Sequence, residues 1–312
     1  MADLFDPAAL DIENPADLLA YLRRMGHIAA DETPRLRTLA GGVSNRTVWV
    51  TRPSGEAWVL KQALSKLRVP VDWFSSPLRV HREALGLRYL AELAPPGTIP
   101  PLVFEDHPAH LIAMQAVPEP HANWKTLLLA GQLDSEHVRQ FGALLATIHA
   151  RAYARRAELE PLFADRSFFE SLRLEPYYGY TAAQVPAAAP FLHALIEQTR
   201  RRTLTLVHGD YSPKNILVYG GRLILLDHEV IHWGDPAFDL GFSLTHLLSK
   251  AHHRPGQRAE FAAAARLYWQ IYAGGVAALP WTADLEGHAM RHTLACLLAR
   301  VAGRSPLEYL TP

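Results

Sequence analysis

The alternation of apolar and polar positions predicts a chain that begins with one helix and continues into a small sheet. Asn14 and Pro15 suit the N-cap and the first turn of a helix, and the leucines that follow them fall on one face. From residue 36 onward, short apolar runs alternate with turns that contain glycine or proline, a pattern typical of antiparallel strands. Strands are predicted at 36–39, 47–51, 57–61, 102–105 and 110–114, with a helix at 77–93.

Beyond Pro118 the pattern becomes mostly helical, because apolar residues recur every three or four positions. Helices are predicted near 124–130, 135–151, 188–203, 237–249, 257–273 and 282–302, and a β-hairpin at 215–227 interrupts them. The chain is therefore predicted to be an α+β protein with two lobes. A sheet lobe with a leading helix is expected at 1–117 and a mainly helical lobe at 118–312. Ligands favour the crevice between two such units.

The composition is that of a globular protein, with 49% apolar and 20% charged residues, so it excludes wholesale disorder and fibrous folds. Lys and Arg together number 31, as do Asp and Glu, so no net field attracts the chain to nucleic acid or to an anionic membrane. The N-terminus lacks the pattern of a secretory signal, and no apolar run is long enough to cross a bilayer. We therefore expect a cytoplasmic protein without a nucleic-acid or membrane partner.

Two residue types that often carry chemistry are expected to be structural here. Cys296 is the only cysteine, which excludes a disulfide within the chain and a C-x-x-C site, and its apolar neighbours favour core packing. The 16 histidines are scattered and share no spacing typical of metal ligands. His149, at the end of a predicted helix, is likewise expected to be structural.

The predicted hairpin carries polar side chains at its outer ends, in an otherwise apolar neighbourhood. Asn215 begins the first strand and Asp227 ends the second, 12 positions later. Because a tight hairpin returns the chain beside its start, the amide oxygen and the carboxylate should face one point in space. Such oxygen ligands suit a hard cation such as Mg²⁺, with phosphate oxygens completing the coordination. The hairpin therefore predicts a magnesium site at Asn215 and Asp227.

Asp210 lies five positions before Asn215, on the loop that enters the predicted metal site. From there its carboxylate could accept a proton from an incoming hydroxyl group, which is the role of a catalytic base. The alternative is that Asp210 and Asn215 only cap turns, as Asp and Asn often do. The convergence of three polar residues at this spacing favours the catalytic interpretation.

The predicted sheet lobe supplies groups suited to phosphate. Gly41, Gly42 and Ser44 lie in a turn whose backbone N–H groups can approach phosphate oxygens, and the same residues also describe a plain hairpin turn. Lys61 ends an apolar strand, which is a costly place for a charge unless an anion or a carboxylate meets it.

Glu83, in the predicted helix that follows this strand, is the candidate partner of Lys61. A lysine held by a glutamate and directed at phosphates is a recurring part of phosphoryl-transfer sites. The alternative is that Glu83 is a solvent-exposed helix residue paired with Arg79.

In their order along the chain, these features match the protein-kinase signature: a glycine-rich turn, a strand lysine, a helix glutamate, His208-Gly-Asp-x-x-x-x-Asn215 and then Asp227. The segment Leu226-Asp-His-Glu-Val-Ile-His-Trp-Gly-Asp-Pro-Ala-Phe-Asp-Leu240 resembles the aminoglycoside phosphotransferase and choline kinase family of small-molecule kinases. The resemblance covers about residues 36–250 and is strongest at 206–243. It implies a protein-kinase-like two-lobed fold and an enzyme that uses ATP and Mg²⁺.

The resemblance also implies a role for each residue of the predicted site. Asp210 is the catalytic base, and Asn215 and Asp227 are the Mg²⁺ ligands. Lys61 holds the phosphates of ATP and is oriented by Glu83.

Further roles follow from the same resemblance. The adenine base would bind along a linker made of Met114, Gln115, Ala116 and Val117. Asp239 would support the catalytic loop, whereas Asp235 is expected to cap the helix that starts beside it. Glu229, two positions after the metal-binding aspartate, resembles an extra acidic residue of choline-kinase-like members, and its role stays open.

The expected reaction transfers the γ-phosphoryl group of ATP to a hydroxyl of a small-molecule acceptor. Acidic residues of the helical lobe are dispersed among arginines, so a sugar-like or amino-alcohol acceptor is favoured over a polycationic aminoglycoside. The segment 61–68 also resembles methylthioribose kinases. Aromatic residues could stack on a sugar or enclose an ammonium group, or could simply pack in the core: Trp124, Phe168, Phe169, Tyr177, Tyr178 and Tyr180.

Two other function classes are weighed against this one. A nucleotide-binding pseudokinase is disfavoured because Lys61, Asp210, Asn215 and Asp227 are all present. A protein kinase is disfavoured because Asp-His-Glu replaces Asp-Phe-Gly and no Ala-Pro-Glu motif follows. The segment after Asp227 is also too short for a peptide-binding activation loop.

Overall fold

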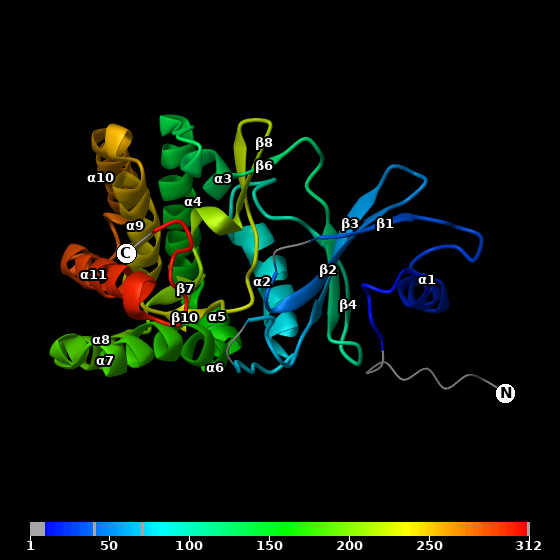
Figure 1. Cartoon of the computed structure of the whole chain (residues 1–312), viewed down its shortest axis with the longest axis horizontal. Helices are drawn as coiled ribbons and strands as arrows, with labels where there is room; N and C mark the ends of the chain where they lie inside the picture. Colours follow the sequence, from blue (N-terminus) through cyan, green and yellow to red (C-terminus); the bar gives the residue numbers. More distant parts are fainter. Residues whose placement is uncertain (1–9, 40–41, 70–71, 311–312) are drawn as a thin grey trace. The chain divides into compact units, whose positions relative to one another are not determined.

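The computed structural model describes residues 10–39, 42–69 and 72–310, and the chain divides into two compact units. The first unit contains the residues up to Arg88 together with Pro100–Pro118, and the second contains Tyr89–Ile99 and Glu119–Pro312. The first unit is built on an antiparallel sheet and the second is mainly helical (Figure 1), so the predicted α+β class is confirmed. The division into domains at 1–117 and 118–312 stays a prediction.

The sheet of the first unit has five strands, all paired with antiparallel neighbours, in the order β1-β2-β3-β5-β4. Along β3 the side chains alternate between the two faces of the sheet. Trp58 and Leu60 are buried in the core, whereas Val59 and Lys61 belong to the other face. The five predicted strands are confirmed: β1 (Arg35–Thr38), β2 (Asn45–Thr51), β3 (Ala57–Ala63), β4 (Leu102–Asp106) and β5 (Leu111–Gln115).

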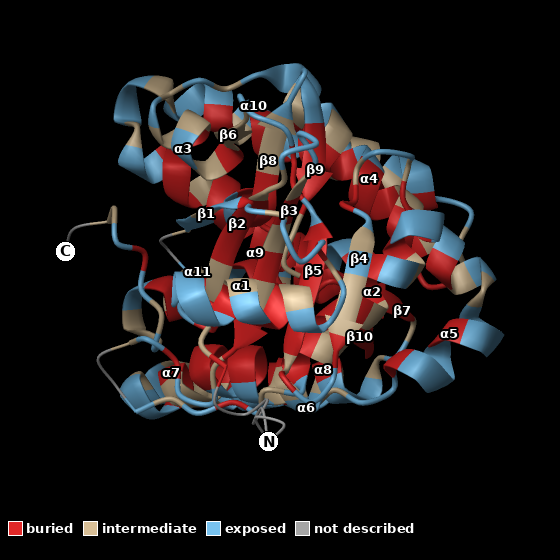
Figure 2. Cartoon of the chain, turned by 90° about the vertical axis from the view of Figure 1, so that its right-hand side faces the viewer, coloured by how far each residue is buried: buried red, intermediate tan, exposed pale blue. Residues whose placement is uncertain are grey.

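Helix α1 (Pro15–Arg24) packs against this sheet. It begins as predicted, because the Asn14 side chain caps it by accepting a hydrogen bond from the Ala16 N–H. Its buried face shares a core with the apolar residues of β2, β3 and β5 (Figure 2). The Tyr21 hydroxyl donates to the Asp106 carboxylate at 2.6 Å, which ties the helix to the end of β4. Helix α2 (Arg79–Leu93) starts in the first unit and ends in the second.

The six helices predicted for the second unit are confirmed, and the structure adds shorter elements between them. The described helices are α3 (Trp124–Leu129), α4 (Ser135–Ala154), α5 (Arg156–Phe163), α6 (Ser167–Phe169), the π-helix η2 (Glu170–Gly179), α7 (Tyr180–Gln184), η3 (Pro186–Ala188), α8 (Ala189–Arg201), η4 (Pro213–Asn215), α9 (Pro236–His253), η5 (Pro255–Gln257), α10 (Arg258–Val276) and α11 (Leu285–Ala302). Within residues 10–39, 42–69 and 72–310, no helix is long and apolar enough to span a membrane.

Two small sheets complete the second unit and carry its polar loops. The predicted hairpin is confirmed as β8 (Ile216–Tyr219) and β9 (Arg222–Leu225), joined at its edge by β6 (Ala122–Asn123). A second pair consists of β7 (Thr205–Val207) and β10 (His232–Gly234). The loops that leave β7 and β9 contain the residues singled out from the sequence.

Helices α9 and α11 cross so closely at Gly241 that no side chain fits there. A Cβ atom at this position would lie 2.3 Å from the Cβ of His292 and 2.7 Å from the backbone nitrogen of Thr293. We expect Gly241→Ala to lower the free energy of unfolding by about 3 kcal/mol, because the two helices must move apart. Thermal unfolding measures the loss.

The matched control for this variant is Gly274→Ala in α10. A Cβ atom at Gly274 meets no atom within 4 Å, so alanine there should be neutral or slightly stabilising. Equal melting temperatures for the two variants would show that the α9–α11 contact is not as tight as described.

Candidate active site

The two predicted metal ligands lie at the open end of the β8–β9 hairpin. Ile216 pairs with Leu225, and the Leu226 N–H donates to the Asn215 carbonyl at 2.9 Å. Asn215 is therefore beside the segment that leads into Asp227, as the hairpin predicted. Asp227 has a left-handed backbone with φ of 68°, which residues other than glycine rarely adopt. Strain of this kind is tolerated mainly at functional positions.

Asp210 and Asn215 contact each other directly. The Asn215 Nδ2 donates to Oδ2 of Asp210 at 2.7 Å and to the Asp210 carbonyl at 3.0 Å, and both residues are buried. Because the NH₂ group of the amide is used on Asp210, its Oδ1 is the atom that can ligate a cation. An amide oxygen and the Asp227 carboxylate form an all-oxygen donor set, which fits Mg²⁺.

Arg173 is a site residue that sequence reasoning missed. It lies in the π-helix η2 and places its guanidinium 2.8 Å from Oδ2 of Asp210. Its Nε also donates to the Gly209 carbonyl at 3.0 Å, so it holds both the side chain and the loop of the predicted base. Burial alone would lower the pKa of Arg173, but the nearby carboxylates, Asp210 above all, raise it above the ordinary value. The guanidinium is therefore a permanent positive charge beside Asp210.

Asp239, an acidic residue in the first turn of α9, supports the loop that carries Asp210. This is the role that the resemblance implied. Its two carboxylate oxygens accept hydrogen bonds from the N–H groups of His208 and Gly209 at 2.7 and 2.8 Å. His149 lies 3.3 Å from the same carboxylate and is buried, so its structural interpretation is confirmed. Burial would raise the pKa of Asp239, but His149 and the loop N–H groups lower it below the ordinary value.

Gly209 is required by the shape of this loop. Its φ is 78°, and a Cβ atom there would lie 3.0 Å from both the side chain and the carbonyl of Val230. A larger residue would push the loop that carries Asp210 away from Val230, which lies two positions before β10. The backbone conformation of this loop therefore explains why the His-Gly-Asp segment has glycine at its second position.

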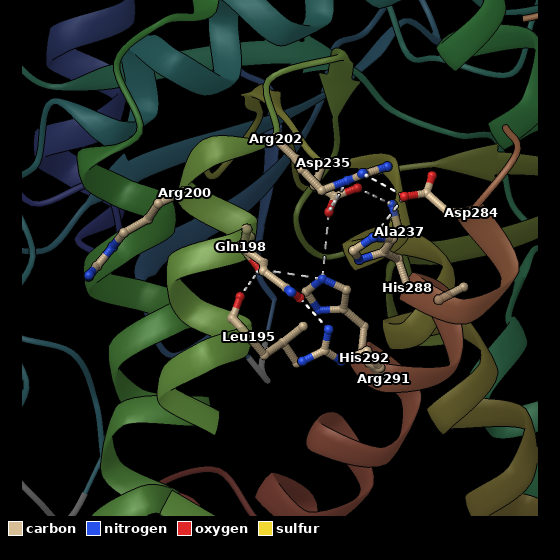
Figure 3. Close-up of polar contacts among 12 residues, drawn as sticks. Leu195, Gln198, Arg200, Arg202, Asp235, Ala237, Asp284, His288, Arg291 and His292 are labelled. Carbon is tan, nitrogen blue, oxygen red and sulfur yellow. Dashed lines mark hydrogen bonds and ion pairs between the residues drawn. The ribbon is translucent and has the colours of Figure 1, made fainter. Parts of the chain in front are cut away.

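Asp235 is the N-cap of α9, as predicted, and takes no part in the candidate site. Its Oδ1 accepts from the Ala237 N–H at 3.0 Å, and its Oδ2 lies 3.2 Å from Nε of Arg202 (Figure 3). Burial would raise its pKa, but His292 and Arg202 together lower it below the ordinary value. The figure shows these side chains directed at one another in the helical core.

In the first unit, Lys61 and Glu83 form the predicted pair. The Nζ of Lys61 lies 2.6 Å from Oε1 of Glu83. Glu83 is fully buried, so the alternative of a solvent-exposed glutamate is wrong. Arg79 binds backbone carbonyls, among them those of Ser44 and Leu64, and so fixes the end of the glycine-containing turn. The position of Lys61 on β3 is thus held by α2.

The remaining predicted nucleotide contacts are only partly described. Gly41 lies outside the described residues, whereas Gly42 and Ser44 precede β2 and the Ser44 hydroxyl accepts from the Asn45 amide at 3.1 Å. Met114 and Gln115 end strand β5, and Val117 follows it. The N–H groups of Gln115 and Ala116 donate to carbonyls of the first unit. These two N–H groups of the predicted linker are therefore already bonded within the first unit.

Of the two interpretations left open for the aromatic residues, core packing holds for most of them. Trp124, Phe169, Tyr177 and Tyr178 are buried, and only Phe168 and Tyr180 are half-exposed. Cys296 lies in the same core as Tyr178, whose hydroxyl is 3.2 Å from its sulfur. Glu229 is buried too, and its charge contributes to raising the pKa of Arg173.

Comparison with known proteins agrees with this geometry. A model of the family described as "Phosphotransferase enzyme family" matches residues 35–279. A curated relative, methylthioribose kinase 2 of Oryza sativa subsp. japonica, is 26% identical over 264 residues, which cover 75% of this chain. The match spans 62% of that relative, so the chain corresponds to less than two thirds of its length.

Solved structures share the fold across nearly the whole chain. The macrolide 2'-phosphotransferase of Brachybacterium faecium has a TM-score of 0.57 and 23% sequence identity, over 91% of this chain and 90% of its own. The choline kinase of Cryptosporidium parvum Iowa II has a TM-score of 0.56 and 11% identity, over 90% of this chain and 87% of its own. The protein-kinase-like fold implied by the sequence is therefore confirmed.

Proposed function

Because the chain belongs to the phosphotransferase enzyme family, we propose that it transfers the γ-phosphoryl group of ATP to a hydroxyl of a sugar-like or amino-alcohol acceptor. The observation that carries this proposal is the arrangement around Asp210. Its carboxylate is buried, and its Oδ2 is held by both the Asn215 amide and the Arg173 guanidinium. Such an arrangement serves to orient a reacting group, which is the main task of the protein in phosphoryl transfer.

Within this proposal Asp210 orients the acceptor hydroxyl and receives its proton. Asn215 and Arg173 both contact Oδ2, so Oδ1 is the oxygen directed to the acceptor.

The remaining charged residues of the proposed site bind the nucleotide. Asn215 and Asp227 would hold Mg²⁺, which neutralises phosphate charge when bound. Lys61, oriented by Glu83, would hold the phosphate oxygens. Gly42 and Ser44 would approach the phosphates, and the linker at Met114–Val117 would receive the base.

The acidic residues of the second unit are dispersed among arginines, which disfavours a polycationic acceptor. Glu170 pairs with Arg200, and Glu158 pairs with Arg155. The kinship with methylthioribose kinases supports a sugar-like acceptor.

The test is ADP release from Mg-ATP in the presence of sugars, amino alcohols and aminoglycosides. We expect a sugar-like or amino-alcohol acceptor to raise the rate at least about tenfold above background hydrolysis, a difference well within typical enzymatic turnover. Asp227→Ala, which removes one proposed Mg²⁺ ligand, should show background release with every acceptor. Stimulation by aminoglycosides alone would favour the antibiotic-modifying alternative, and nucleotide binding without turnover would favour the pseudokinase.

A further inference from the structure

We propose that the first unit binds one divalent transition-metal ion, zinc by the chemistry of its donors, between His81, Glu105 and His107. The Nδ1 of His81 lies 2.7 Å from Oε1 of Glu105, and the Nε2 of His107 lies 3.2 Å from the same oxygen. One ligand atom from each residue falls within 4.8 Å of the other two. These separations allow one ion to be reached by all three side chains. The inference does not depend on the proposed phosphoryl transfer.

The fold brings these residues together from three places. His81 lies in the first turn of α2, Glu105 lies in β4, and His107 lies in the turn between β4 and β5. The separation of 24 positions between His81 and Glu105 explains why no linear motif revealed the cluster. The proposal gives His81 and His107 a role other than the structural one expected of most of the histidines.

The donor set selects the class of metal. Two imidazole nitrogens with one carboxylate oxygen suit zinc and its neighbours among the divalent transition metals. Mg²⁺ and Ca²⁺ prefer oxygen donors throughout and are disfavoured here. Three protein ligands leave a fourth tetrahedral position for water.

Two of the proposed ligands are themselves held by a neighbouring side chain, as metal ligands in proteins commonly are. The Nε2 of His81 lies 3.1 Å from Nδ1 of His110, so a ring that ligates through Nδ1 can donate its remaining N–H to His110. The Arg88 guanidinium pairs with Oε2 of Glu105, which leaves Oε1 for the ion. Both contacts would fix the orientation of a ligand.

An ion can reach the proposed site from solvent because one of the three ligands is exposed. The side chains of His81 and Glu105 are only 11% and 6% exposed, whereas that of His107 is 71% exposed. The His107 ring is stacked on His81, with ring centroids 4.1 Å apart, and must turn toward the ion to ligate it. Its exposed position permits this movement. The bound ion would join α2 to the β4–β5 turn.

The experiment titrates the full chain, without an affinity tag, with ZnCl₂ in excess Mg²⁺ and follows heat and melting temperature. Excess Mg²⁺ occupies the all-oxygen site proposed in the second unit. We expect one zinc ion per chain and a higher melting temperature with zinc. His107→Ala should weaken binding by more than about 100-fold, and Arg88→Met by about 10-fold, since it only orients a ligand.

His193→Ala is the matched control, because His193 is an exposed histidine on α8 in the other unit. It should bind zinc as the wild type does. The absorption of bound Co²⁺ provides a second measurement, since histidine and carboxylate ligands change its visible spectrum. The proposal would be overturned if His107→Ala bound zinc as tightly as the wild type. It would also be overturned if His193→Ala lost as much zinc affinity as His107→Ala, because the binding would then come from adventitious surface histidines.

Discussion

Asp210→Asn should lower kcat for phosphoryl transfer by about 10³-fold while the protein still binds Mg-ATP. Asparagine keeps the size of the side chain but cannot accept the proton of the acceptor hydroxyl, and general-base catalysis contributes effects of this order. The proposed nucleotide-binding residues Lys61 and Glu83 lie in the first unit and are unchanged. The measurement combines ADP release with direct titration of Mg-ATP. Near-normal turnover would exclude Asp210 as the base.

The contact with Arg173 makes a folding control necessary. In Asp210→Asn the buried guanidinium loses its carboxylate partner, which we expect to cost about 3 kcal/mol of unfolding free energy. The double variant Asp210→Asn with Arg173→Met removes both charges and should recover most of that stability. Because it still lacks a base, it should remain inactive. Recovery of stability without recovery of activity separates the chemical role of Asp210 from its structural one.

The parts of the site that the sequence predicted are those encoded by local pattern. The hairpin from Asn215 to Asp227 follows from alternating strands and a Tyr219-Gly220-Gly221 turn, and it brings the chain at Asn215 beside the segment that leads into Asp227. The pairing of Lys61 with Glu83 follows from the sequence because a charge at the end of an apolar strand needs a partner. In both cases the physical reason for the predicted contact can be read from a short stretch of the sequence.

Arg173 could not be predicted in this way. It reaches Asp210 across 37 positions of chain, and it lies on a π-helix that also contains Pro176, so the usual helical period is absent. The nearby Tyr177 and Tyr178 were ambiguous for a related reason. An aromatic run looks the same in a sequence whether it lines a site or fills a core, and only the burial of these side chains decides.

Replacing Lys250 by methionine should raise the free energy of unfolding by about 3 kcal/mol at pH 7. Lys250 lies in α9 and is fully buried. Burial, assisted by the charges of Lys125 and Arg300 and opposed by Glu308, lowers its pKa from 10.5 to about 7. Its Nζ donates to the His246 carbonyl at 3.1 Å and lies 3.5 Å from the Tyr309 hydroxyl, neither of which supplies a negative charge. Methionine has a similar length and no charge to bury.

Because the pKa of Lys250 is lower in the folded chain than in the unfolded one, the stability gained by Lys250→Met depends on pH. Between pH 7 and 10.5 the unfolded chain binds a proton at Lys250 that the folded chain does not hold, so the wild type gains stability as the pH rises through this window. Below pH 7 the full cost of the buried charge is present. The advantage of Lys250→Met should therefore be largest at pH 7 and below, and should shrink toward pH 10.5.

Chemical denaturation of the wild type and Lys250→Met at several pH values between 6 and 10 measures this difference. Lys66→Met is the matched control, because Lys66 is exposed and pairs with Asp72 at the surface, so its substitution should change stability little and equally at each pH. A gain in Lys250→Met that does not vary with pH would mean that packing, rather than the charge, determines the cost. A loss of stability at pH 7 would mean that the ammonium group finds compensation within the core of the second unit.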